Sequence, residues 1–314
     1  MNREPMIEFG DCRETMRRWK EQGIKAQTCV TSPPYYGLRD YGHDGQIGLE
    51  ETPEEYIKAM VEVFRCVWDV LEDDGTLWLN IGDSYYNSNG FARASPEYQR
   101  EGRNNMPAND RKLDKLHETG LKTKDLIGIP WMMAFALRAD GWYLRQDIIW
   151  HKPNPMPESV QDRCTKAHEY IFLLSKSQKY YYDSDAIKEQ STSKSEGIRF
   201  GGNKYGDDDD PKFATKSGNV SKEYDKANKR SVWTVTTKPY AGAHFAVFPS
   251  DLIEPCILAG APIGGIVLDP FMGSGTTAQV AQNLGRQYIG CELNPDYCQL
   301  QNIRTAQQSF GFEA

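Results

Sequence analysis

The sequence predicts an α/β fold organised around a parallel sheet, and two observations support this. Short apolar runs alternate with amphipathic stretches whose apolar residues recur at helical spacing, the pattern of repeated strand–helix units. Further along, a glycine-containing turn at 267–277 lies between one such run and a helical stretch. With 314 residues, of which 39% are hydrophobic and 11% aromatic, the chain is long enough to bury a sizeable core.

The first predicted elements are a strand, a helix and a second strand, at 27–31, 52–71 and 76–81. The first strand is a run of β-formers that a Pro-Pro pair ends. The helix begins after Thr52 as N-cap, with a proline next and an acid at the third helical position, and its apolar residues recur at helical spacing. Asp74-Gly75 predicts a turn into the second strand.

The middle of the chain predicts a helix, a strand and a hairpin. The helix covers 126–140 and ends at Gly141, and the strand covers 143–150. Two β-rich runs, at 169–174 and 179–183, are separated by a short polar turn. They are expected to pair with each other as a hairpin.

Two strand–helix pairs follow, at 265–269 with 276–284 and at 287–292 with 295–308. Between the regular parts, residues 84–124 and 183–232 lack an apolar period. Both are far longer than the usual connection of ~4–6 residues. Judged alone, each is either a solvated surface insertion or a binding element.

Charge and cysteine content limit the classes of protein. The formal net charge of −7 counts, for the whole chain, against a nucleic-acid partner. The charge is unevenly distributed along the chain. Residues 1–92 contain nine basic and seventeen acidic residues. Residues 93–124 contain eight basic and five acidic residues, and residues 212–230 contain six basic and two acidic residues. Positive charge therefore gathers in the two irregular stretches, and a DNA partner stays compatible with the sequence.

No apolar run is long enough to cross a membrane, and no signal peptide is recognisable. The seven cysteines form no C-x-x-C pair, which predicts reduced thiols in the cytoplasm. The five histidines are scattered, so no metal site is expected.

The glycine turn predicts a nucleoside site. Gly273 and Gly275 let the backbone approach a ligand, and the helix that begins at Thr276 points its free N–H groups toward it. Glu292 ends the next strand, where a carboxylate can accept from ribose hydroxyls. No lysine follows the loop and no third glycine completes a dinucleotide motif, so a nucleoside without phosphates fits better, and a nucleotide-dependent dehydrogenase is disfavoured. S-adenosylmethionine is such a ligand; an ordinary glycine-rich turn is the alternative.

A second candidate site is the Thr-Ser-Pro-Pro-Tyr turn that follows strand 27–31. Two prolines make it rigid, and its carbonyls together with the Ser32 hydroxyl form an array of acceptors. Such an array suits an exocyclic amino group, because accepting its hydrogens leaves the nitrogen lone pair free to attack a methyl group. Tyr35 offers a face for a planar ring. A structural Pro-Pro stop followed by core tyrosines is the alternative.

TSPPY followed far downstream by DPFMGSGTT resembles the beta class of S-adenosylmethionine-dependent amino-group DNA methyltransferases of bacteria and phages, which methylate cytosine N4 or adenine N6. The resemblance implies a Rossmann-like methyltransferase fold with a mixed, mostly parallel sheet and a circularly permuted motif order. It extends over most of the chain, through Gly10-Asp11-Cys12, 73–83, 145–157, 244–252 and 290–295.

The resemblance also implies roles for individual residues and a flipped target base. The implied catalytic residues are Ser32, Pro33, Pro34 and Tyr35. The implied cofactor-binding residues are Asp11, Cys12, Thr31, Phe248, Pro249, Asp269, Phe271, Gly273, Ser274, Gly275, Thr276 and Glu292. The implied walls of the target-base pocket are Trp150, Lys152 and Asn154. Asn154 either reads a base edge or only shapes a turn between prolines, and Lys152 either meets phosphate or is solvated.

Cytosine N4 is the favoured target, because Ser-Pro-Pro-Tyr is more typical of cytosine enzymes; adenine N6 is the alternative. The resemblance divides the chain into a catalytic half at 1–182, which contains the inserted loop 84–124, a target-recognition region at 183–232 and a cofactor-binding half at 233–314. It implies double-stranded DNA as partner and leaves a homodimer and a cognate restriction enzyme open. Methyl transfer to RNA or protein, and a catalytically silent DNA-binding subunit, are the competing interpretations.

Overall fold

The computed structural model describes residues 6–38, 42–43, 45–86, 120–191, 226–237 and 248–306. The chain forms two compact units, one of Met1–Asp183 with Arg230–Ala314 and a smaller one of Ser184–Lys229. In the smaller unit, the described parts are the 3-10 turn η1 (Asp185–Ile187) and the antiparallel pair β6 (Glu189–Gln190) and β7 (Lys226–Ala227).

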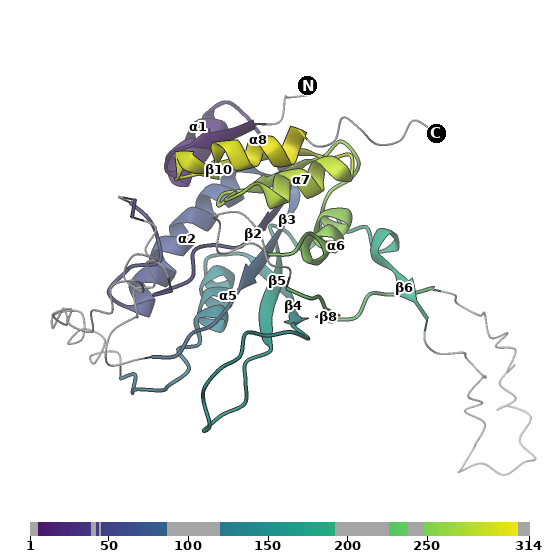
Figure 1. The fold of residues 1–314 in the computed structure, drawn as a ribbon. Helices are drawn as coiled ribbons and strands as arrows, with labels where there is room; N and C mark the ends of the chain where they lie inside the picture. The colour runs from purple at the N-terminus through teal and green to yellow at the C-terminus, as the bar shows by residue number, and fades with distance from the viewer. Residues whose placement is uncertain are drawn as a thin grey trace, which may run out of the picture. The chain divides into compact units, whose positions relative to one another are not determined.

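The described part of the larger unit is built on an eight-stranded sheet in the order β1-β10-β9-β2-β3-β5-β4-β8 (Figure 1). In that order the strands are Met6–Phe9, Gln287–Glu292, Ile266–Asp269, Ala26–Thr31, Leu71–Ile81, His168–Ser175, Tyr143–His151 and Val232–Thr234. Among these eight described strands, all neighbouring pairs are parallel except the two that involve β5, which runs antiparallel to β3 and β4. The expected mixed, mostly parallel α/β sheet is therefore confirmed.

Two groups of helices pack on the two sides of this sheet (Figure 1). One group is α1 (Cys12–Glu21), α2 (Pro53–Val70) and α5 (Ile129–Ala139), and the other is α6 (Ser250–Gly260), α7 (Thr276–Asn283) and α8 (Cys298–Ala306). None of the described helices is long and apolar enough to cross a membrane.

Helix α2 forms as predicted. The Glu55 N–H donates to Thr52 Oγ1 at 3.2 Å, and Pro53 occupies the first helical position, where its missing N–H removes no helical hydrogen bond. Its buried residues Tyr56, Met60, Val63, Phe64, Val67 and Val70 recur at helical spacing.

Several predicted boundaries differ from the structure. Strand β3 begins at Leu71, directly after α2, instead of following a turn at Asp74-Gly75. Ala26 of β2 pairs with Leu71 and Thr28 pairs with Thr76, so the extra residues at 72–75 form a bulge in β3. Helix α5 begins at Ile129 rather than at 126, because Gly128 has a φ of +88° and stops the helix there. The helix expected from 295 begins as a 3-10 turn, η3 (Pro295–Tyr297), before α8, and residues 307–308 lie outside the described residues.

The predicted hairpin at 169–183 is wrong. Strand β5 pairs with β3 on one side and β4 on the other, so both of its edges are occupied and no edge is left for residues 179–183. These residues are not a strand; instead, the Tyr181 N–H donates to the Asp74 carbonyl and the Asp183 N–H to the Ala259 carbonyl.

Strand β1 and helices α1 and α6 were not predicted. Strand β1 has only four residues, and α6 contains Pro255, which disrupts a sequence pattern for a helix. Most of the two irregular stretches, at 87–119 and 192–225, lies outside the described residues.

The strand directions bring many segments to one edge of the sheet. The carboxyl ends of the parallel strands β1, β10, β9, β2 and β3 meet there, as does that of β4. Because β5 is antiparallel, its first residues, from His168, arrive at the same edge. In sheets of this kind, ligands bind at this edge.

Candidate active site

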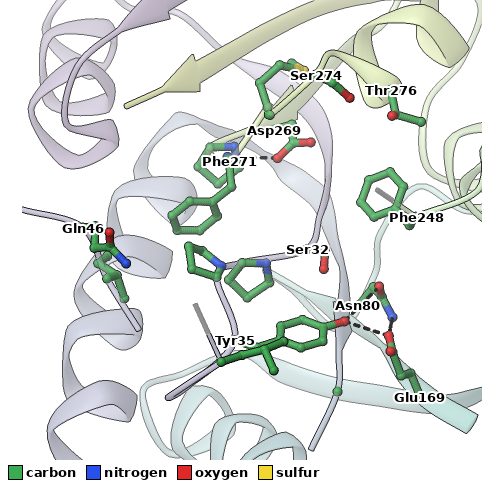
Figure 2. A pocket seen from close by; sticks show the side chains of 18 of the residues that line it. Ser32, Tyr35, Gln46, Asn80, Glu169, Phe248, Asp269, Phe271, Ser274 and Thr276 are labelled. Carbon is green, nitrogen blue, oxygen red and sulfur yellow. Dashed lines mark hydrogen bonds between the residues drawn. The ribbon is translucent and has the colours of Figure 1, made fainter. Parts of the chain in front are cut away.

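A cavity of about 960 Å³ lies at this edge of the sheet (Figure 2). Most of the predicted site residues line it: Asp11, Cys12, Ser32, Pro33, Pro34, Tyr35, Trp150, Lys152, Asn154, Phe248, Asp269, Phe271, Gly273, Ser274, Thr276 and Glu292. Thr31, Pro249 and Gly275 are not among its lining residues. The glycine turn and the Ser-Pro-Pro-Tyr turn, far apart in sequence, therefore face one space.

The glycine turn is held against the end of the neighbouring strand β10. Gly273 and Gly275 have φ values of +54° and +88°, which side-chain-bearing residues rarely adopt, and Gly275 is the N-cap of α7. The Gly273 N–H donates to Glu292 Oε2 at 2.7 Å, and the Asn294 N–H donates to Glu292 Oε1 at 2.8 Å. Burial raises the pKa of Glu292, while these backbone donors act in the opposite direction. Each carboxylate oxygen keeps a lone pair for a ligand hydroxyl.

Asp269 joins three segments behind this turn. Thr31 Oγ1 donates to one of its oxygens at 2.7 Å, Thr277 Oγ1 donates to the other at 2.6 Å, and the Phe271 N–H donates at 3.0 Å. The side chain is fully buried, and this burial raises the pKa of Asp269 to about 6. Thr31 thus acts on the site through Asp269.

Ser274 leaves a polar atom for a ligand. Its hydroxyl is buried at the cavity and has no hydrogen-bond partner among the described residues. An unsatisfied buried hydroxyl is costly, so a ligand that hydrogen-bonds to Ser274 would be stabilised there. Together with the Glu292 carboxylate, this end of the cavity suits a hydroxyl-bearing, phosphate-free ligand, as expected for a nucleoside.

Asp11 and Cys12 close the same end from helix α1. Asp11 caps α1 by accepting the Arg13 N–H at 2.7 Å, and its carboxylate also pairs with the Arg13 guanidinium. This pairing lowers the pKa of Asp11. Burial raises the pKa of Cys12 to about 12, so the thiol stays neutral.

The Ser-Pro-Pro-Tyr turn is anchored at two points. The Tyr56 hydroxyl of α2 donates to the Pro34 carbonyl at 2.8 Å, and the Tyr35 hydroxyl donates to Glu169 Oε2 at 2.7 Å. Ser32 faces the space between Tyr35 and the Phe248 ring (Figure 2). The bond to Tyr56 directs the Pro34 carbonyl toward α2, and Ser32 and Pro33, which line the cavity, offer it a hydroxyl and a carbonyl as acceptors.

The three predicted pocket walls have distinct partners. The Trp150 indole N–H donates to the Val235 carbonyl at 2.8 Å, and the Lys152 ammonium lies 4.2 Å from the Trp150 ring centroid while pairing with Glu169. The Asn154 amide both donates to and accepts from the Thr237 backbone, at 3.1 and 3.0 Å. These bonds favour the turn-shaping role for Asn154 over the reading of a base edge.

Sequence reasoning missed Asn80 and Glu169, which line the cavity beside Tyr35. Glu169 stands near the start of β5, and an acid at that position points into the cavity only because β5 runs against its neighbours. Lys166, whose ammonium donates to the Asp83 carbonyl at 2.8 Å, was missed for the same reason. Burial lowers the pKa of Lys166. The described residues contain no group of three or more His, Cys, Asp or Glu that could hold a metal ion.

Comparison with known proteins agrees with this geometry. The sequence model of the N6/N4 methyltransferase family, described as DNA methylase, matches residues 26–303. The Type II methyltransferase M.SmaI of Serratia marcescens is 48% identical over 303 residues, which cover 95% of this chain and 89% of that protein.

Two solved structures share the fold. The cytosine-N4-specific PvuII DNA methyltransferase superposes with a TM-score of 0.62 at 17% identity, over 99% of this chain and 89% of its own. A DNA modification methylase homologue from Thermus thermophilus, TTHA0409, solved with S-adenosyl-L-methionine, superposes with a TM-score of 0.58 at 22% identity, over 98% of this chain and 96% of its own. The match over most of the sequence, the extensive identity to M.SmaI and the shared fold agree, and the chain belongs to the N6/N4 family of DNA methylases.

Proposed function

We propose that this protein is a Type II modification methyltransferase that moves a methyl group from S-adenosylmethionine to the N4 amino group of a cytosine in double-stranded DNA. The Type II methyltransferase relatives support the reaction class, and the Ser-Pro-Pro-Tyr turn facing the glycine turn across one cavity supports the mechanism. As a modification enzyme, it would act beside a restriction endonuclease of the same specificity.

The cofactor fits the glycine-turn end of the cavity. S-adenosylmethionine supplies a methyl group bound to a cationic sulfur. The Glu292 carboxylate would accept from the ribose hydroxyls, and the buried Ser274 hydroxyl would gain the partner that it lacks among the described residues. The Phe271 ring, which lines the cavity, offers a face to a cation.

The Ser-Pro-Pro-Tyr turn would hold the base. The amino hydrogens would donate to Ser32 Oγ and to the Pro33 carbonyl, which turns the nitrogen lone pair toward the methyl group. The methylated nitrogen would then lose its proton to solvent, because a neutral hydroxyl and an amide carbonyl are too weakly basic to keep it. Anchoring of the turn by Tyr56 and by Glu169 fixes these acceptors before the base arrives. A base paired inside a duplex cannot reach this cavity, so the proposal includes extrusion of the target nucleotide.

The choice of cytosine rests on Ser32. A neutral hydroxyl at the first position of the turn stabilises positive charge on the nitrogen less than a carboxylate would, and it is more typical of cytosine enzymes in this family. Target recognition is assigned to residues 183–232, whose segment 212–230 carries six basic and two acidic residues.

The test is methylation-sensitive sequencing of DNA from cells that express either the protein or its Ser32→Ala variant. We expect 4-methylcytosine at a specific site with the natural chain, and about 100-fold slower methylation with the variant, because one of two preorganised hydrogen-bond partners is lost. A 6-methyladenine signal would overturn the target base. The absence of both signals, with folded protein present in the cells, would overturn the methyltransferase function.

A further inference from the structure

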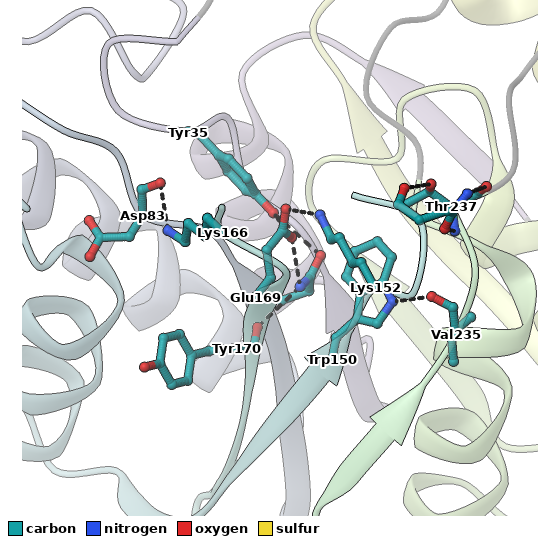
Figure 3. A network of polar contacts seen from close by, with 11 residues as sticks. Tyr35, Asp83, Trp150, Lys152, Lys166, Glu169, Tyr170, Val235 and Thr237 are labelled. Carbon is teal, nitrogen blue, oxygen red and sulfur yellow. Dashed lines mark hydrogen bonds and ion pairs between the residues drawn. The ribbon is translucent and has the colours of Figure 1, made fainter. Parts of the chain in front are cut away.

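Four polar side chains form a connected network at the end of the cavity assigned to the base: Tyr35, Lys152 and Glu169 (Figure 3) and Asn80 (Figure 2). We call it the Glu169 network. Glu169 Oε2 accepts from the Tyr35 hydroxyl at 2.7 Å and from the Asn80 amide at 3.4 Å, and Glu169 Oε1 accepts from the Lys152 ammonium. The four residues come from β2, β3, β4 and β5 or the residues just after them, so one carboxylate connects four strand ends.

The ion pair at the centre of this network is largely removed from water. The side chains of Lys152 and Glu169 are only 18% and 15% exposed. Desolvation of two charges offsets most of their attraction, and apolar residues of similar volume often stabilise a fold equally well or better. Fold stability alone therefore does not explain a charged pair here. What distinguishes the pair is that both partners line the cavity.

The backbone directly after β3 fits tightly against this network. A Cβ atom on Gly82 would lie 2.7 Å from Tyr35 Cε2 and 3.3 Å from Glu169 Cδ. The first distance is shorter than contacts between such atoms allow, so only glycine leaves room for the ring at this place. The Tyr35 ring is thus held by the Gly82 backbone on one side and by Glu169 at its hydroxyl.

The charges of the network balance. Lys152 is the cation that lies over the Trp150 ring, and the Glu169 carboxylate compensates it. A compensated pair presents no net charge, which suits a neutral heterocycle. An unpaired lysine in the same place would instead attract a phosphate anion and repel the positive charge that develops on a methylated amino group.

From these contacts we infer that Glu169 is a positioning residue for methyl transfer: it sets the Tyr35 ring and neutralises Lys152, so that the cavity accepts an uncharged base beside Ser32. This inference rests on the proposed function, which supplies the extruded base. It concerns kcat more than binding, because the network is already formed before any base enters.

The experiment compares Glu169→Gln with the double variant Lys152→Met/Glu169→Gln. Glutamine still accepts from Tyr35 but cannot compensate Lys152, so we expect kcat to fall about 10- to 100-fold, while binding of S-adenosylhomocysteine changes less than about twofold. Removing the uncompensated cation as well should restore part of the lost kcat. Asp140→Asn is the matched control: Asp140 is equally 15% exposed in its ion pair with Arg65 and does not line the cavity, so its kcat should stay near that of the natural chain.

Glu169→Gln with unchanged kcat, or a double variant no faster than the single one, would overturn this assignment while leaving the proposed function intact. A kcat loss equal to that of Asp140→Asn, tracking a lowered melting temperature, would also overturn it, because the role would then be structural. If the natural chain itself transfers no methyl group to any duplex, the proposed function fails, and the assignment fails with it.

Discussion

Asp269 shows how one carboxylate can hold several segments of a site together. It accepts hydrogen bonds from Thr31, Phe271 and Thr277, which belong to β2, the glycine turn and α7. Its complete burial raises the pKa of Asp269 to about 6, above the ordinary value of about 3.9 in an unfolded chain. The folded protein therefore binds this proton more tightly than the unfolded chain does.

This difference predicts a pH dependence of stability. The contribution of Asp269 is fully present below its unfolded pKa and is lost as the pH rises through about 6. Relative to an Asp269→Asn variant, which does not titrate, the natural chain should lose about 2 kcal/mol of unfolding free energy between pH 4.5 and pH 7. Urea unfolding of both proteins at the two pH values measures it. The prediction is contradicted if the unfolding free energy of the natural chain, relative to that of the variant, is the same at both pH values or is higher at pH 7.

Single residues also show what the sequence could reveal of the site. Gly273, Glu292 and Ser32 were recognisable, because their chemistry depends on neighbours close in the sequence. Glu169 was not, because its meaning depends on the direction of β5, which no local pattern encodes. For Asn154 the sequence left two roles open, and its bonds to the Thr237 backbone favour the turn-shaping role.

At the scale of elements, the start of α2 is coupled to the Ser-Pro-Pro-Tyr turn. Thr52 caps the helix, and Tyr56, in the first turn, reaches the Pro34 carbonyl. The helix start therefore fixes one of the two anchors of the turn, while strand β5 supplies the other through Glu169.

Replacing Thr52 by alanine should lower the unfolding free energy by about 1 kcal/mol, because the Glu55 N–H loses its side-chain acceptor. Thr52→Ser keeps the hydroxyl and serves as the control, with a stability close to that of the natural chain. Denaturant unfolding measures both variants. Equal losses for alanine and serine would show that the hydroxyl does not cap the helix.

An element could be predicted where local sequence signals specify it. It could not be predicted where pairing with distant strands decides whether it forms. Helix α2 has a cap, a proline and a periodic apolar face, and these signals agree. Residues 179–183 carry a strand-like pattern, yet they form no strand, because β3 and β4 already occupy both edges of β5. Competition for a sheet edge is decided by distant strands, so the sequence pattern could not show it.

At the scale of the whole molecule, the charge of separate segments says more about DNA binding than the net charge does. The net charge of −7 hides a basic stretch at 212–230 and an acidic excess within residues 1–92. DNA binding would therefore depend on local positive charge, which releases counterions from the phosphates when it binds.

The affinity for duplex DNA should fall steeply with salt, and the slope should depend on the basic stretch. A triple variant in which glutamine replaces Lys212, Lys216 and Lys222 should have a less steep dependence of log K on log salt. The magnitude of the negative slope should decrease by about 0.9 for each lysine that contacts phosphate. The matched control places glutamine at Arg17, Lys20 and Lys58, within the acidic segment, and should keep the slope. Fluorescence anisotropy at several salt concentrations measures it; equal slopes in the two triple variants would refute this role for the basic stretch.

The order of strands in the sheet has a consequence for synthesis on the ribosome. Strands β2, β3, β4 and β5 are made early and can pair with one another, but β2 must wait for β9, and the Thr31–Asp269 hydrogen bond joins residues 238 positions apart. At elongation rates of roughly 5–20 residues per second, that delay lasts on the order of ten seconds or more. During this time the Ser-Pro-Pro-Tyr turn exists without the strands that hold the glycine turn, so a nascent chain cannot yet bring the two turns together.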